Sequence, residues 1–235
     1  MVVGHGGRVS WATTMSYTRD RVFDFCTELF MDRRTATSSD PSGSTSSSLI
    51  ASLRARDPTA WERLCQLYGP EVYRWARSSG LQDTDAADIV QEVFLAVASG
   101  IESFRHDSPG DSFRGWLWGI TRNKLHDHFR RRAGRPVATG GTDAQEQLLQ
   151  IPEAPPDASS ATLGTDAALV HRALEVIRVE FEDRTWQAFW RLAIDAERAA
   201  DIARDLGMTP RAVRQAKYRV LQRLRAELPD LNGPV

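Results

Sequence analysis

Residues 199–225 read AADIARDLGMTPRAVRQAKYRVLQRLR, and two helical patterns meet there at a glycine. Two apolar residues four positions apart precede the glycine and share one face of a short first helix. Gly207 stands where a helix commonly ends on a left-handed residue. Thr209 is suited to cap a second helix, and Pro210 to occupy its first position. The stretch therefore predicts a helix-turn-helix, whose second helix typically enters the major groove of DNA.

The second helix carries two different faces. Apolar side chains recur at helical spacing on one face, namely Val213, Val220, Leu221, Leu224 and Leu228. The other face is basic and polar in the first turns, with Arg211, Arg214, Gln215, Lys217, Tyr218 and Arg219. Side chains near the start of a recognition helix reach base edges, and Arg and Gln can each form paired hydrogen bonds with a base. A solvated basic face on an ordinary bundle is the alternative, but the agreement of cap, glycine and basic turns favours DNA binding.

Composition limits the remaining classes. A chain of 235 residues with a formal net charge of -1 has room for two small domains and is not a non-specific polycation. Cys26 and Cys65 form neither a CxxC motif nor a cluster with histidine, so neither a disulfide framework nor a zinc site is expected. The sequence has no apolar run of membrane-spanning length and no secretory signal pattern. We therefore expect a cytoplasmic protein without membrane insertion.

The domain organisation follows from the distribution of helical patterns and breakers. Residues 1–48 are poor in structural signals and end in a Ser/Thr-rich tract, which predicts a disordered extension; one hypothesis is that the residues before Met31 are dispensable. Helical patterns fill residues 49–132 and 167–230. Residues 133–166 are rich in Gly and Pro without a sustained period, which predicts a flexible linker. The predicted fold is all-α, with two small helical domains.

The first domain contains an acidic stripe and a long helix that ends in basic residues. Asp57-Pro58 predicts the start of one helix, and Asp83 or Thr84 is expected to cap the next. Three carboxylates of this next helix share one stripe with an amide close by, the set being Asp85, Asp88, Gln91 and Glu92. The long helix runs from Ser112 to about Arg132, with Phe113, Trp116 and Leu117 expected in the core. His126 and His128 are two apart and point away from each other, so they predict no metal site.

Two segments of this domain carry a resemblance to a known family. DIVQEVFL at 88–95, followed by FRGWLWGITRNK at 113–124, resembles conserved region two of bacterial sigma factors. The helix-turn-helix resembles region four, and the group that keeps only regions two and four is the extracytoplasmic-function (ECF) group of the sigma-70 family. The resemblance implies a region 2 bundle at 49–132 and a region 4 helix-turn-helix at 167–230. It also implies a subunit that binds core RNA polymerase and directs promoter-specific initiation.

The resemblance also implies roles for single residues. The acidic stripe, Asp85, Asp88, Gln91 and Glu92, matches the surface that binds the β′ clamp helices; from the residues alone, a solvated acidic face is the simpler interpretation. The set that matches the recognition and melting of the minus-10 element is Phe104, His106, Arg122, Asn123 and Lys124. The basic face of the recognition helix matches the reader of the minus-35 element. Further implied partners are the β flap and promoter DNA, and an anti-sigma factor is left open.

Two rival functions come from other classes. A stand-alone helix-turn-helix regulator would bind operator DNA without polymerase, with the first domain as a sensor, but it needs neither the acidic stripe nor a basic melting helix. A nucleic-acid-processing enzyme would need a catalytic motif, and the sequence contains no P-loop, metal-ligand cluster or nucleophile motif. We therefore expect no catalytic residues, no metal and no cofactor. The promoter sequence and the inducing stimulus cannot be predicted.

Overall fold

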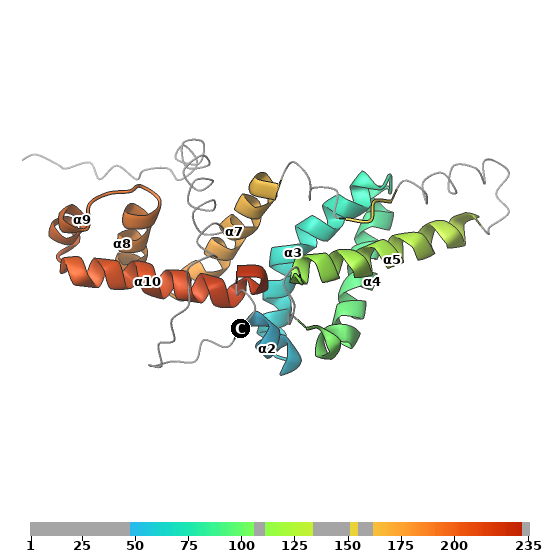
Figure 1. Cartoon of the computed structure of the whole chain (residues 1–235), viewed down its shortest axis with the longest axis horizontal. Coiled ribbons are helices and arrows are strands. Elements are labelled where there is room, and N and C mark those ends of the chain that lie inside the picture. The colour runs from blue at the N-terminus through green and yellow to red at the C-terminus, as the bar shows by residue number, and fades with distance from the viewer. Residues whose placement is uncertain (1–47, 106–110, 134–150, 155–161, 232–235) are drawn as a thin grey trace, which may run out of the picture. The chain divides into compact units, whose positions relative to one another are not determined.

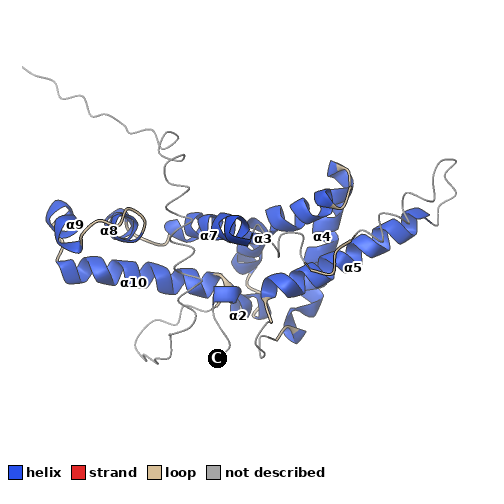
Figure 2. Cartoon of the chain, turned by 45° about the horizontal axis from the view of Figure 1, so that its top comes forward, coloured by secondary structure: helices blue, strands red, loops and turns tan. Residues whose placement is uncertain are grey.

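The computed structural model describes residues 48–105, 111–133, 151–154 and 162–231. These residues form helices and connecting loops, without a strand (Figure 2). Their helices are α2 (Leu49–Arg54), α3 (Pro58–Ser78), α4 (Asp83–Gly100), α5 (Phe113–Ala133), α7 (Thr162–Arg178), α8 (Asp183–Ala193), α9 (Ala199–Leu206) and α10 (Pro210–Glu227), with single 3-10 turns at Ile101–Ser103 and Pro229–Leu231. The all-α class expected from the sequence is confirmed. The N-terminal extension lies outside the described residues.

The described residues form two compact units. Unit 1 contains residues 180–220, and unit 2 contains residues 48–179 and 221–231. The sequence analysis began its second domain near Ala167, but α7, which includes that position, belongs to unit 2. A hydrogen bond explains part of this division, because the Arg172 side chain on α7 donates to the Leu67 carbonyl of α3 at 2.9 Å. Apolar periodicity marked α7 as a helix without indicating the helix against which it packs.

In unit 2, α3, α4 and α5 enclose an aromatic and aliphatic core. Each helix contributes fully buried side chains, among them Tyr68, Val72 and Trp75 from α3, Ile89, Val93 and Val97 from α4, and Phe113, Leu117 and Phe129 from α5. Edge-to-face ring contacts join α3 to α5, with centroids 5.1 Å apart for Tyr68–Phe113 and 5.2 Å for Trp75–Trp118. The expected core role of Phe113 and Leu117 is confirmed, and Trp116 is partly buried.

Helices α4 and α5 run antiparallel, and this arrangement positions the charged surface described below. Near the end of α4, a Cβ atom added to Gly100 would lie 3.4 Å from the Trp116 ring, close to the start of α5. Near the start of α4, Asp85 pairs with Arg132 at the end of α5. The acidic stripe of α4 therefore lies alongside the basic C-terminal half of α5 (Figure 1).

The helix starts show which capping predictions were right. The Asp57 carboxylate accepts from the Thr59 amide at 2.9 Å, and Pro58 begins α3, as expected. The predicted cap of α4 was wrong, since the residue preceding the helix is Gln82 and its side chain makes no capping bond. Asp83 instead lies in the first turn, where it pairs with Arg77 at 3.0 Å and accepts from the Tyr73 hydroxyl at 3.1 Å.

The end of α10 and the turn after it complete the core of unit 2. Glu227 is fully buried, and its carboxylate pairs with Arg63 at 3.0 Å and with Arg223 at 2.6 Å. The Asp230 carboxylate accepts from the amides of Phe113 and Arg114, so it caps the start of α5. These carboxylates lie more than a hundred residues from their partners, and no local sequence pattern indicates the pairing.

Part of the predicted linker also belongs to unit 2. Ile151 is buried, and the Glu153 carbonyl accepts from the Trp118 indole at 3.1 Å. The bulky Trp118, heavier than the family resemblance suggests, therefore has an indole partner outside its own helix. Residues 134–150 and 155–161 of the predicted linker lie outside the described residues.

Candidate nucleic-acid and protein interfaces

The turn between α9 and α10 holds the first turns of α10 in place. Gly207 ends α9 in the left-handed conformation, with φ of 59°, as predicted. The Thr209 hydroxyl accepts from the Ala212 amide at 3.1 Å, which confirms the predicted cap, and Pro210 begins the helix. The Arg184 guanidinium donates to the Gly207 carbonyl at 2.7 Å and fixes the turn against α8. The start of α10 is thus ordered independently of any ligand.

The predicted DNA-reading side chains lie together on the exposed side of α10. Val213, Ala216 and Val220 are buried in unit 1, whereas Arg211, Arg214, Gln215, Tyr218 and Arg219 are exposed and Lys217 is partly exposed. Tyr218 keeps 51% of its surface exposed, which is unusual for a large side chain on a packed helix. Among the described residues, none of the salt bridges involves Arg211, Arg214, Lys217 or Arg219. These four cations are available to phosphates and bases.

Unit 1 pairs another of its cations with carboxylates. Arg191 on α8 donates to Glu197 at 2.9 and 2.5 Å and to Asp205 on α9 at 2.7 Å. These hydrogen bonds raise the pKa of the Arg191 guanidinium above its ordinary value, and the bonds from Arg191 lower the pKa of the Glu197 carboxyl. The triad joins α8 to α9 and so supports the helix-turn-helix.

The residues predicted to handle the minus-10 element fall into three groups. Asn123 is exposed on α5, and Arg122 and Lys124 beside it are partly buried. Phe104 is 5% exposed, with its ring 5.4 Å from Phe113, so in this structure it is a core residue and does not offer a face to an unstacked base. Periodicity could not reveal this, because Phe104 follows a 3-10 turn. His106 lies outside the described residues.

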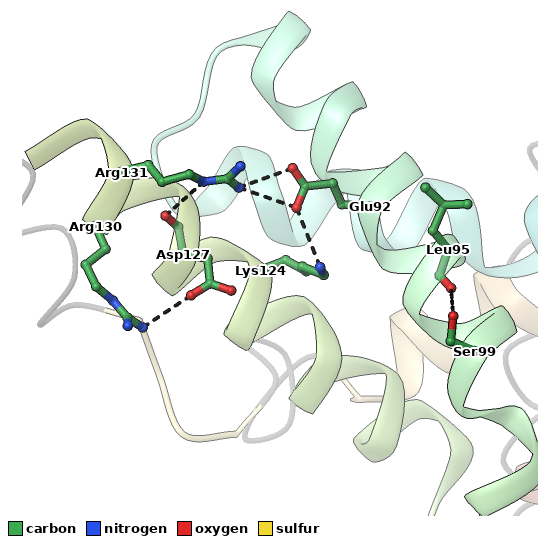
Figure 3. A network of polar contacts seen from close by, with 7 residues as sticks. All are labelled: Glu92, Leu95, Ser99, Lys124, Asp127, Arg130 and Arg131. Atoms are coloured by element: carbon green, nitrogen blue, oxygen red, sulfur yellow. Dashed lines mark hydrogen bonds and ion pairs between the residues drawn. The ribbon is translucent and has the colours of Figure 1, made fainter. Parts of the chain in front are cut away.

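The acidic stripe is divided between free and paired carboxylates. Asp88 and Gln91 are exposed, as expected for a solvated or partner-binding face. Glu92 pairs with Arg131 at 3.2 Å and with Lys124 at 3.7 Å (Figure 3). Asp85 pairs with Arg132 at 3.7 Å and lies 3.9 Å from His128, a pair that is ionic only when His128 is protonated. The structure therefore joins two sets of residues that the sequence analysis treated as separate sites.

Several residues of this surface were not predicted. A hollow between the helices is lined by Glu92, Lys124, Asp127, Arg130 and Arg131. Asp127 organises it, because its carboxylate pairs with Arg130 at 3.3 Å and its carbonyl accepts from Arg131 at 3.2 Å (Figure 3). The run of arginines at 130–132 was a visible signal, but its partners on α4 depend on helix packing. Leu95, on α4 beyond Glu92, is 70% exposed and gives the stripe an apolar neighbour.

The histidines of α5 do not gather metal ligands. Burial lowers the pKa of His126 below its ordinary value, with neighbouring Arg122 and Arg130 adding to the effect. The described part of the chain contains no group of three or more His, Cys, Asp or Glu side chains placed to hold a metal ion. Within the same residues, every helix is too short or too polar to cross a membrane.

Comparison with known proteins places these helices in a family. A family model of sigma-70 region 2 matches residues 64–135, which hold most of α3 and all of α4 and α5. The sigma factor CnrH of Cupriavidus metallidurans is 34% identical over 92 residues, or 39% of this chain and 47% of CnrH. The ECF sigma factor BldN of Streptomyces coelicolor is 28% identical over 184 residues, or 77% of this chain and 65% of BldN. These matches span less than two thirds of either relative.

A third relative is matched over more of its own length. The ECF sigma factor ShbA of Streptomyces griseus is 31% identical over 143 residues, which cover 59% of this chain and 69% of ShbA. The match to the region 2 model and the match to ShbA agree with the helix-turn-helix of unit 1 and the antiparallel α4–α5 pair of unit 2. The chain belongs to the extracytoplasmic-function group of the sigma-70 family.

Proposed function

We propose that this chain is an RNA polymerase sigma factor that binds core polymerase and directs promoter-specific initiation. One observation carries the proposal: the chain combines a recognition helix whose cations are unpaired with a separate unit that carries the region 2 helices. A stand-alone regulator needs the first feature and not the second. The proposed place of action is the cytoplasm, where bacterial promoters lie.

In this proposal the exposed face of α10 reads the minus-35 element. Arg211 and Arg214 extend from the first turns, where side chains of a recognition helix reach base edges. Gln215 is suited to a paired contact with adenine, and the arginines are suited to guanine. Lys217 and Arg219 are assigned to phosphates, and Tyr218 to the sugar–phosphate backbone or a base edge.

The acidic stripe of α4 is assigned to the β′ clamp helices. Asp88 and Gln91 are exposed, and Asp85 and Glu92 keep about a third of their carboxylate surface accessible despite their ion pairs. The exposed Leu95 beside the stripe supplies apolar area of the kind found in protein–protein contacts. Unit 1 is assigned to the β flap, and an anti-sigma factor is a further proposed partner that would compete for the same surfaces.

The minus-10 function is assigned to the middle of α5. Asn123 is the best-placed residue for the captured single strand, because it is exposed and has basic neighbours on both sides. Phe104 is no longer part of the assignment, because its ring is buried. Asn123→Ala should leave polymerase binding intact and slow promoter opening, and a pre-melted template should restore the rate. A defect that persists on the pre-melted template assigns Asn123 to another step.

Transcription in vitro tests the proposal as a whole. Core RNA polymerase is incubated with a library of genomic fragments in the presence or absence of the full chain. The expected result is a set of transcripts that start at discrete sites and require the chain. A chain that binds DNA fragments but changes no transcript start would support the stand-alone regulator instead.

A further inference from the structure

The proposed polymerase-binding stripe and the basic end of α5 neutralise each other. Glu92 of the stripe contacts Arg131 and Lys124, and Asp85 contacts Arg132 (Figure 3 for Glu92). Asp88 lies between these carboxylates on the same stripe and is exposed, and none of the salt bridges among the described residues includes it. The pairing is therefore specific to two positions of the stripe.

These ion pairs have the properties of contacts that can exchange. Arg131 and Arg132 keep 62% and 58% of their side-chain surface exposed, and the carboxylates of Glu92 and Asp85 keep 35% and 32%. Exposed pairs of this kind contribute little to stability, so their loss does not threaten the fold. A guanidinium that binds a carboxylate binds a phosphate with the same geometry, so the two anions compete for it.

We propose that the end of α5, with Lys124, Arg131 and Arg132, is a second nucleic-acid contact surface that the carboxylates of the stripe mask. A basic partner surface that binds Glu92 and Asp85 would release these cations for the phosphates of DNA. The inference rests on the proposed function, because the partner is core polymerase and the DNA is the promoter strand. It adds a coupling between the two interfaces that neither interface has alone.

The coupling is reciprocal by thermodynamic linkage. If the partner strengthens DNA binding by releasing cations, DNA strengthens partner binding by the same factor. The two pairs of Glu92 are exposed, so we expect a factor of about two to ten from this carboxylate. The cations of α10 in unit 1 lack such carboxylates among the described residues and should not take part in the coupling.

The DNA arm of the test uses the full chain without polymerase. A fluorescent single-stranded oligonucleotide of mixed sequence is titrated with the parent, Glu92→Gln and Asp88→Asn. Both variants remove one negative charge from the same stripe, but only Glu92→Gln releases Arg131 and Lys124. Glu92→Gln should bind about two- to tenfold more tightly than the parent, and Asp88→Asn should stay close to the parent. Equal strengthening by both variants would reduce the effect to net charge and overturn the masking.

The polymerase arm uses the converse substitutions. Arg131→Gln frees Glu92, whereas Arg130→Gln removes the same charge from a residue that pairs with Asp127 on its own helix. Arg131→Gln should bind core polymerase about two- to fivefold more tightly than Arg130→Gln. Equal affinities, with parent binding intact, would overturn the masking.

The two arms also separate the inference from the proposed function. A parent chain that fails to bind core polymerase overturns the sigma-factor proposal, and with it the coupling. Parent binding that is intact, combined with no difference in either matched pair, leaves the sigma-factor proposal standing and removes the masking alone. Circular dichroism of every variant checks that α4 and α5 remain helical.

Discussion

Helices α10 and α5 are both basic, and they differ in what surrounds their cations. Within the described residues, none of the salt bridges reaches Arg211, Arg214, Lys217 or Arg219 of α10, whereas carboxylates of α4 pair with Lys124, Arg131 and Arg132 of α5. The α10 cations project from a helix start fixed by the Thr209 cap. The α5 cations lie against a neighbouring helix of opposite charge. The same chemistry thus gives a surface ready for DNA in one unit and a neutralised surface in the other.

The difference separates binding from licensing. A surface with free cations attracts phosphate at any time, and its salt dependence follows from the number of contacts. A surface whose cations are paired must exchange one anion for another, so its gain on binding DNA is small until the carboxylates have another partner. For a polymerase subunit, this would make contact at the minus-35 element independent of core polymerase and contact near the minus-10 element conditional on it.

The largest expected effect comes from reversing the stripe. Asp88→Lys combined with Glu92→Lys places two cations where the proposed basic clamp surface docks, and like charges brought together at an interface cost several kcal/mol. We expect capture of core polymerase in a pull-down to fall by about 100-fold or more, which corresponds to roughly 2.7 kcal/mol. Helicity should stay near that of the parent, because exposed substitutions usually change stability by less than about 0.5 kcal/mol.

A matched variant controls for net charge. Glu62→Lys with Glu102→Lys makes the same charge change at two exposed positions of unit 2 outside the stripe. This control should retain capture within a few-fold of the parent. Equal loss of capture in the two double variants would mean that general electrostatics, and not the stripe, governs the interaction.

The next effect concerns the unmasked helix. Arg211→Ala or Arg214→Ala should each cost about 1–3 kcal/mol at one position of the minus-35 element and relax the base preference there. Transcription from a promoter library randomised at that element measures the preference. Arg198→Ala, which removes an exposed arginine of unit 1 just before α9, is the control and should leave the base preference unchanged. Unchanged preference in both α10 variants would contradict the assignment of this helix.

Most of the helices could be predicted because their signals are local. Gly207, Thr209 and Pro210 each act within a few residues, and the structure places all three as expected. Asp57 and Pro58 did the same for α3. Thr84 carries the same chemistry as Thr209, yet α4 begins at Asp83 and the residue before it, Gln82, makes no capping bond. A capping residue in the sequence therefore indicates a helix start only to within a residue or two.

What could not be predicted depends on distant partners. Phe104 has the aromatic ring that a base-stacking role needs, but its neighbours Phe113 and Trp116 come from a different helix and bury it. Asp230 caps a helix that begins more than a hundred residues earlier. The stripe was predicted as a helix face, while the cations that pair with it lie more than thirty residues away on α5. Periodicity identifies a face, and only packing identifies what covers it.

The two threonines give a smaller and sharper test of the comparison. Thr209→Ala removes the acceptor of the Ala212 amide and should destabilise the start of α10 by about 1 kcal/mol. Hydrogen exchange should show faster exchange of the Ala212 amide, and affinity for minus-35 DNA should fall modestly as the cations lose their fixed positions. Thr84→Ala is the control, because α4 starts without a side-chain cap. Equal changes in local exchange at the two helix starts would contradict the capping role of Thr209.

The smallest expected effect is a pH dependence of unit 1. Hydrogen bonds from Arg191 lower the pKa of Glu197 below the ordinary value of 4.5, so the folded state holds the ionised form more strongly than the unfolded state. This contribution to stability is fully present above pH 4.5 and is lost as the pH falls through the lower folded-state value. Thermal unfolding of the parent should change little from pH 7 to about 5 and then decline, with a shallower decline in Glu197→Gln. Glu182→Gln, an exposed carboxylate before α8, should follow the parent. Carbon-13 titration of the Glu197 carboxyl checks the cause directly, and a midpoint at or above 4.5 would contradict it. The DNA-facing cations of α10 should respond little to this titration, because Arg191 and its carboxylates join α8 to α9.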